Sequence, residues 1–117
     1  MDDQLPLDTR SDDKLMAQMR FSALDSLGRR EHSKRELANK LSAKFDLPIH
    51  SPEIQTCLDK LALDGYQSDE RFAEVFVRSR RARGYGPLFI EQELRQRGVA
   101  GELIVAVVNR SDAEWLS

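Results

Sequence analysis

The sequence predicts an all-α fold: a modular, elongated array of tandem three-helix repeats, with two complete units and the start of a third. Two stretches share one pattern, Leu27–Leu41 (LGRREHSKRELANKL) and Arg80–Leu94 (RRARGYGPLFIEQEL). A shift of 53 positions superimposes their apolar pairs, which are Leu37 with Leu41 and Ile90 with Leu94. Such repetition is typical of stacked units that cannot bury their apolar faces alone. No segment shows strand-type alternation of comparable strength.

Residues 11–64 are predicted to form the first unit, preceded by a flexible acidic segment over residues 1–10. Its first helix should begin near Ser11 and end near Leu27. Two aspartates follow Ser11 directly, where the positive end of the helix dipole favours carboxylates.

The second and third helices of this unit have clear start signals. Ser33 and Glu36 form a capping box, in which each side chain accepts the backbone N–H of the other residue. This helix should end before Pro48, because a residue that precedes proline disfavours the helical conformation. Ser51 and Pro52 then supply an N-cap and a first-turn proline for the third helix.

Residues 68–110 are predicted to form the second unit. Its first helix opens at Ser68, and its second opens at Pro87 and ends at Gly98, the expected left-handed terminator. Its third helix contains residues 103–108, a β-branched run that its repeat partner in the first unit identifies as helical.

A seventh helix is predicted to begin near Asp112. Residues 111–117 therefore belong to the start of a truncated third unit, and the chain ends inside it.

Composition excludes several classes of function. Of the 117 residues, 40% are hydrophobic and 32% charged, and no apolar run approaches the roughly 20 residues that span a bilayer. The N-terminal sequence lacks the features of a secretion signal, so we expect a cytoplasmic protein without membrane contact. Cys57 has no cysteine to pair with, and two histidines complete no usual zinc set. We expect neither cofactor nor metal, and no nucleophile or nucleotide-loop motif predicts an enzyme.

Charge is segregated along the chain, although the net charge is only −2. Residues 29–44 carry six basic against two acidic residues, and residues 71–97 carry seven against three, so each block is +4. Residues 1–13 sum to −4 and residues 45–70 to −5. This alternation suits an anionic polymer on one face and a protein partner on another, although ordinary solvated helix faces would produce it too.

The binding candidates lie in the two basic blocks. They are Arg29, Arg30, Lys34 and Arg35 in the first unit, and Arg78, Arg80, Arg81 and Arg83 in the second. Guanidinium forks pair with either phosphate or carboxylate, and the sequence does not choose between them. Tyr85 either stacks on an exposed base or packs over its own turn. His32 is interpreted as a surface or capping group, and Cys57 as a small buried hydrophobe.

Taken together, three motifs resemble the RecX family of bacterial regulatory proteins. They are RREHSKREL at 29–37, LALDGYQSDERFAEVFVRSR at 61–80 and GYGPLFIEQELRQRG at 84–98. The resemblance covers roughly residues 20–110. Members of that family are arrays of three-helix repeats, usually three of them, whereas this chain ends just inside a third.

The resemblance implies a protein that binds the RecA recombinase filament on single-stranded DNA, and we expect it to be a monomer. It implies inhibition of the RecA ATPase, of filament extension and of strand exchange, which would modulate recombination and the SOS response. The eight basic residues are then candidate contacts with RecA or DNA, with weak or nonspecific direct binding of DNA.

Two alternatives remain open from the residues alone. Three-helix units with basic helices also describe helix-turn-helix proteins, which bind duplex DNA without RecA and with a steep salt dependence. A pure protein-interaction adaptor would bind no nucleic acid.

Overall fold

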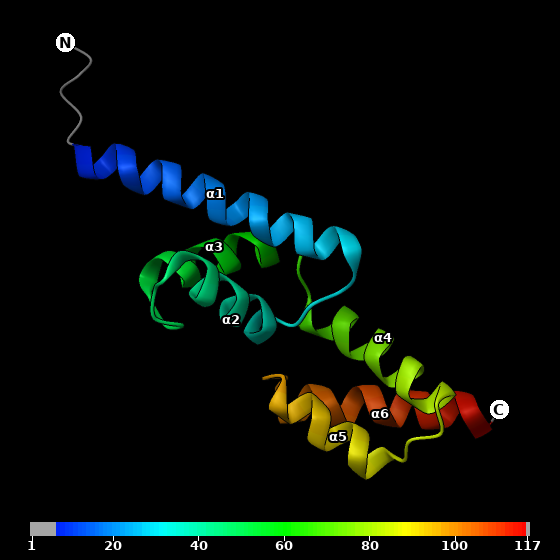
Figure 1. The fold of residues 1–117 in the computed structure, drawn as a ribbon. Helices are drawn as coiled ribbons and strands as arrows, with labels where there is room; N and C mark the ends of the chain where they lie inside the picture. The colour runs from blue at the N-terminus through cyan, green and yellow to red at the C-terminus, as the bar shows by residue number, and fades with distance from the viewer. Residues whose placement is uncertain (1–6, 117) are drawn as a thin grey trace.

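The computed structural model describes the backbone of residues 7–116 and the side chains of residues 12–111. Within that part the chain forms helices and no strands, which confirms the predicted all-α class. The helices are α1 (Leu7–Arg29), α2 (Lys34–Phe45), α3 (Pro52–Leu63), α4 (Asp69–Ala82), α5 (Pro87–Gln96) and α6 (Gly101–Leu116). Figure 1 shows α1–α3 and α4–α6 as two groups that follow one another along the molecule.

Local capping explains where the helices begin. Ser33 Oγ accepts the N–H of Glu36 at 3.1 Å, and the N–H of Ser33 donates to Glu36 Oε1 at 3.0 Å, so the predicted capping box is present. Ser51 and Ser68 each accept the amide N–H of the residue three positions on, at α3 and α4. Gly98 has φ +83°, as expected of a left-handed helix terminator.

Both ends of the described chain differ from the sequence prediction. Helix α1 begins at Leu7 and not near Ser11, so part of the segment predicted as a tail is helical, while residues 1–6 lie outside the described range. The predicted separate helix near Asp112 is wrong, because α6 continues through that position to Leu116. Neither glycine nor proline interrupts residues 102–116, so nothing in the sequence forces a break.

Each unit has its own hydrophobic core. The core of the first unit consists of Met19, Ala23, Leu37, Ala38, Leu41, Ile54, Cys57, Leu58 and Leu61. The core of the second consists of Phe72, Ala73, Phe76, Val77, Ile90, Leu94, Val99, Ile104, Val107 and Val108. Helix packing is concentrated within the units, α1–α3 in one and α4–α6 in the other.

The molecule is therefore elongated. Its extents are 67 × 24 × 23 Å and its radius of gyration is 17.5 Å, whereas a compact domain of this length has about 13 Å. Two small cores in a row produce this shape, and contacts between the units must then fix how they are oriented.

Candidate functional site

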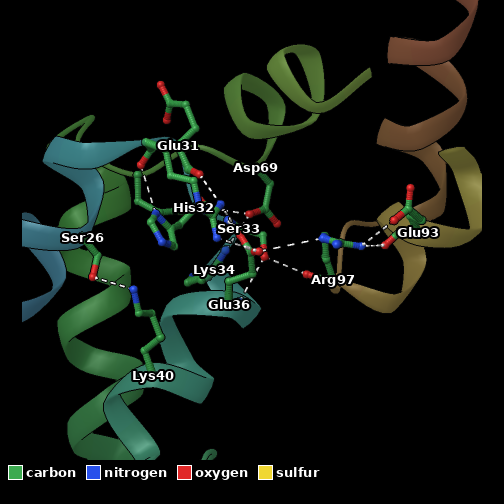
Figure 2. A network of polar contacts seen from close by, with 12 residues as sticks. Ser26, Glu31, His32, Ser33, Lys34, Glu36, Lys40, Asp69, Glu93 and Arg97 are labelled. Carbon is green, nitrogen blue, oxygen red and sulfur yellow. Dashed lines mark hydrogen bonds and ion pairs between the residues drawn. The ribbon is translucent and has the colours of Figure 1, made fainter. Parts of the chain in front are cut away.

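The two units meet through polar groups, which lie mainly on the segment between α1 and α2 and at the end of α5 (Figure 2). Ser33 Oγ donates to the carbonyl oxygen of Arg97 at 2.8 Å. The backbone N–H of Lys34 donates to Asp69 Oδ1 at 2.8 Å, and Gln67 Nε2 donates to the carbonyl oxygen of His32 at 3.3 Å. These bonds join residues 35 to 64 positions apart, so they set the orientation of one unit on the other.

Five alternating charges cross this junction as an ion-pair ladder, which we define as Arg30, Glu36, Arg97, Glu93 and Arg80. The successive N···O distances are 3.2, 3.8, 3.6 and 3.0 Å. The first two residues belong to the first unit and the other three to the second. Because both ends are arginines, the ladder carries one surplus positive charge.

Glu36, the carboxylate that the first unit contributes to the ladder, stays ionised at neutral pH. Burial by itself raises the pKa of Glu36, but hydrogen bonds from the Arg30 guanidinium and the Ser33 N–H outweigh burial and hold the pKa below the usual 4.5. Glu36 thus belongs to both the capping box and the ladder.

A groove of about 400 Å³ runs beside the ladder. Its lining combines arginines from both units, Arg30, Arg80, Arg83 and Arg97, with the ring of Phe76. The guanidinium carbons of Arg80 and Arg97 lie 4.2 and 4.7 Å from the centroid of that ring. These cation–π contacts bind two ladder residues to the core of the second unit.

Gly98, at the end of α5, packs very closely against Arg35 of α2. A Cβ placed on Gly98 would lie 2.5 Å from Cβ of Arg35, closer than side chains come. Only glycine fits this contact, and the positive φ of Gly98 independently favours glycine.

His32 is not at the surface, contrary to the sequence interpretation. It is 2% exposed, and its Nδ1 lies 3.0 Å from the carbonyl oxygen of Arg30. A carbonyl oxygen only accepts, so Nδ1 carries the proton and Nε2 is the atom that titrates. Burial is the main reason why the pKa of His32 is lowered from 6.5.

We expect mild acid to destabilise the protein through His32. The unfolded histidine takes up a proton near pH 6.5, but the folded one resists it, so the free energy of unfolding should fall as the pH drops below about 6.5. Urea unfolding at about pH 7.5 and about pH 5.5 measures this fall. His32→Gln should remove most of it, whereas His50→Gln, at an exposed position, should keep it. Equal pH dependence in all three proteins would contradict the assignment.

The eight candidate residues differ in the interaction partners that they have in the structure. Arg30 and Arg80 belong to the ladder. Arg29 pairs with Asp25 in the same helix, Lys34 Nζ lies 2.6 Å from Asp59 Oδ1, and Arg81 donates to Ser111 Oγ. Within the described part of the chain, no ion-pair partner is found for the other three, which are Arg35, Arg78 and Arg83. Three of the eight, Arg30, Arg80 and Arg83, lie together along the groove.

Sequence reasoning missed the residues that join the units. Ser68 caps α4, and the next residue, Asp69, accepts the Lys34 N–H and so joins the units. Arg97 and Glu93 stand four positions apart, a spacing that predicts a pair within one helix and not its extension to Glu36. Tyr85 stacks on Phe89 with ring centroids 4.7 Å apart and stays 44% exposed.

Other chemistry is sparse in the part that the structure describes. No group of three or more His, Cys, Asp or Glu side chains there could hold a metal ion. Cys57 is 3% exposed, which confirms its interpretation as a buried hydrophobe, and burial raises the pKa of its thiol. None of the helices described is long and apolar enough to cross a membrane.

Two three-helix units with separate cores and a polar, arginine-rich junction define a tandem helical repeat protein. A family profile described as RecX, second three-helix domain, matches residues 68–108. Regulatory protein RecX of Halorhodospira halophila is 48% identical over 99 residues, 85% of this chain and 60% of that protein. Regulatory protein RecX of Legionella pneumophila is 41% identical over 96 residues, 82% of this chain and 62% of that protein. The chain belongs to the RecX family.

The crystal structure of RecX from Lactobacillus salivarius has the same fold. It matches with a TM-score of 0.72 and 22% identity, and the match covers 81% of this chain and 60% of that one. The chain spans about 60% of the length of the two regulatory proteins described above. These relatives are named as regulatory proteins and not as enzymes.

Proposed function

We propose that this protein binds the RecA filament on single-stranded DNA and inhibits its ATPase, its extension and strand exchange. The observation that carries the proposal is membership of the RecX family, at up to 48% identity to proteins named as regulators. In this proposal the protein acts as a monomer in the cytoplasm, modulates recombination and the SOS response, and catalyses nothing itself.

The shape and the charges support the proposal. An array 67 Å long is able to contact more than one subunit of a helical filament. Arg35, Arg78 and Arg83 are available for carboxylate or phosphate without loss of an ion pair to another described residue. Arg29 and Lys34 hold exposed pairs of little net worth, so these cations exchange partners at low cost.

Arg30 and Arg80 are less suitable for testing a contact with a partner, because both belong to the ladder. The Arg80 and Glu93 side chains are 20% and 18% exposed, and reversal of one charge would leave the other ladder charges unbalanced. Reversing Arg80 therefore disturbs the junction and does not test a contact cleanly. Arg78 and Arg83 are exposed and suit a test better.

We expect the double change Arg78→Glu and Arg83→Glu to weaken binding to RecA filaments at least about 10-fold, because opposite charges at an interface become like charges. Biolayer interferometry on filaments held with a non-hydrolysable ATP analogue measures the affinity. The control, Lys14→Glu with Lys60→Glu, makes the same change in net charge at exposed positions of the first unit.

Two results would contradict the proposal in different ways. Unchanged affinity of the Arg78 and Arg83 variant, with circular dichroism showing it folded, would remove that patch from the interface. Binding to bare duplex DNA as tight as binding to the filament, with a steep salt dependence, would favour the helix-turn-helix alternative.

A further inference from the structure

One exposed strip of the second unit combines aromatic, amide and cationic side chains. We define the α5 strip as Arg83, Tyr85, Leu88, Phe89, Gln92 and Arg95. Tyr85, Leu88 and Phe89 are 44%, 80% and 47% exposed, and the other three are also exposed. The ladder does not use any of these residues.

The α5 strip carries no carboxylate. Leu88, Gln92 and Arg95 follow one another at helical spacing, so they share the outward face of α5. Of the two acidic residues of this helix, Glu93 is held by Arg80 and Arg97. Glu91 is partly exposed and stands four positions before Arg95, at the edge of the outward face. A polyanion therefore meets one carboxylate at most along this face, against two arginines.

The chemistry of the strip matches an unpaired polynucleotide. The Tyr85 and Phe89 rings stack at 18° to one another, and a base extends such a stack with whichever ring face is open. In the described part of the chain, no ion-pair partner is found for Arg83 or Arg95, so both guanidinium groups are available to phosphates. The Gln92 amide donates and accepts, as the edge of a base requires.

The corresponding face of α2 in the first unit lacks this combination, which gives an internal comparison. The 53-residue shift places Arg35, Asn39 and Ser42 of α2 on the outward-facing residues of α5, Leu88, Gln92 and Arg95. The amide recurs at the same place, but no aromatic residue stands on that face of α2. At this position of the repeat, only the second unit offers rings on which bases can stack.

We propose that the α5 strip binds single-stranded nucleic acid, with unpaired bases stacked on Tyr85 and Phe89 and phosphates held by Arg83 and Arg95. This inference deepens the proposed function, on which it rests, because it assigns the DNA contact to one helix of the second unit. The rest of the groove, apart from Arg83, and the first unit are then free to contact protein.

The test is binding of a fluorescent oligothymidylate of about 20 nucleotides to the full chain, measured by anisotropy at low salt. Gln92→Glu places a carboxylate in the middle of the strip with little change of shape, and Asn39→Asp makes the matching amide-to-carboxylate substitution at the equivalent exposed position of α2. We expect Gln92→Glu to raise the Kd several-fold and Asn39→Asp to leave it unchanged.

Tyr85→Ala tests stacking separately and should raise the Kd about 5-fold or more. An oligonucleotide of the same length without bases should bind the wild type more weakly and be insensitive to Tyr85→Ala. Circular dichroism confirms that each variant is folded. Absence of oligothymidylate binding by the wild type, or equal Kd values for Gln92→Glu and Asn39→Asp, would overturn the inference.

Inhibition of RecA, measured on the same proteins, separates the two proposals. Strip-dependent oligonucleotide binding without any inhibition of RecA would support the inference and reject the proposed function. Inhibition that weakens in Gln92→Glu while oligonucleotide affinity stays constant would make the strip a protein contact, which overturns the inference and leaves the proposed function intact.

Discussion

Gly98→Ala is expected to lower the free energy of unfolding by about 2–4 kcal/mol and to change the angle between the two units. Two effects add. Alanine is strained at φ +83°, and its Cβ would lie 2.5 Å from Cβ of Arg35, so the end of α5 must move away from α2. That movement stretches the bond from Ser33 Oγ to the carbonyl oxygen of Arg97 and the ladder beside it.

Gly65→Ala is the matched control for this change. Gly65 has nearly the same φ, +85°, but nothing lies within 4 Å of a Cβ placed there. Gly65→Ala should lower the free energy of unfolding only by the cost of alanine at positive φ, about 1 kcal/mol. Its radius of gyration should stay at 17.5 Å. Urea unfolding and small-angle X-ray scattering measure both quantities. Equal losses in the two variants, with unchanged scattering, would show that the close approach to Arg35 does not hold the units together.

Phe76→Ala is expected to destabilise the second unit by about 3–5 kcal/mol. Phe76 is 8% exposed, packs against Phe72 with ring centroids 5.6 Å apart, and lies under the guanidinium groups of Arg80 and Arg97. Its removal leaves a cavity and withdraws the ring that holds two ladder residues. Because the first unit has a separate core, the damage should concentrate in α4–α6.

Amide hydrogen exchange distinguishes the two units in the Phe76 variant. Protection should fall in α4–α6 by much more than in α1–α3. Phe21→Ala removes an aromatic ring that is 75% exposed, and it should change stability by no more than about 0.5 kcal/mol. An equal loss of protection in all six helices would mean that the units unfold as one cooperative body.

Local signals in the sequence were sufficient for most of the fold. The capping box at Ser33, the proline at Pro87 and the terminator at Gly98 act within a few residues of the helix ends they define. Residues 103–108 lie in α6, as predicted. Their β-branched side chains favour a strand, but the repeat aligns them with a helix of the first unit, and that alignment predicts a helix. The predicted helix at Asp112 failed because serine followed by aspartate is only a weak start signal when the preceding helix has no reason to stop.

The junction could not be predicted, because its contacts join residues far apart in the sequence. Glu36 and Arg97 are brought together only when both units are folded and docked. His32 is also buried, although the charged residues Arg30, Glu31 and Lys34 around it in the sequence suggested exposure. Arginines in one basic block look alike in sequence, so nothing there separates Arg80, which the ladder holds, from Arg83 at the exposed end of α4.

We propose above all that this chain acts on the RecA filament. The most direct measurement is the rate of ATP hydrolysis by RecA on single-stranded DNA while the chain is titrated in. We predict that the rate falls at well below one copy of the chain per RecA subunit, because one regulator limits growth of a filament of many subunits. A rate that stays constant up to an excess of the folded chain over RecA would contradict the proposed function.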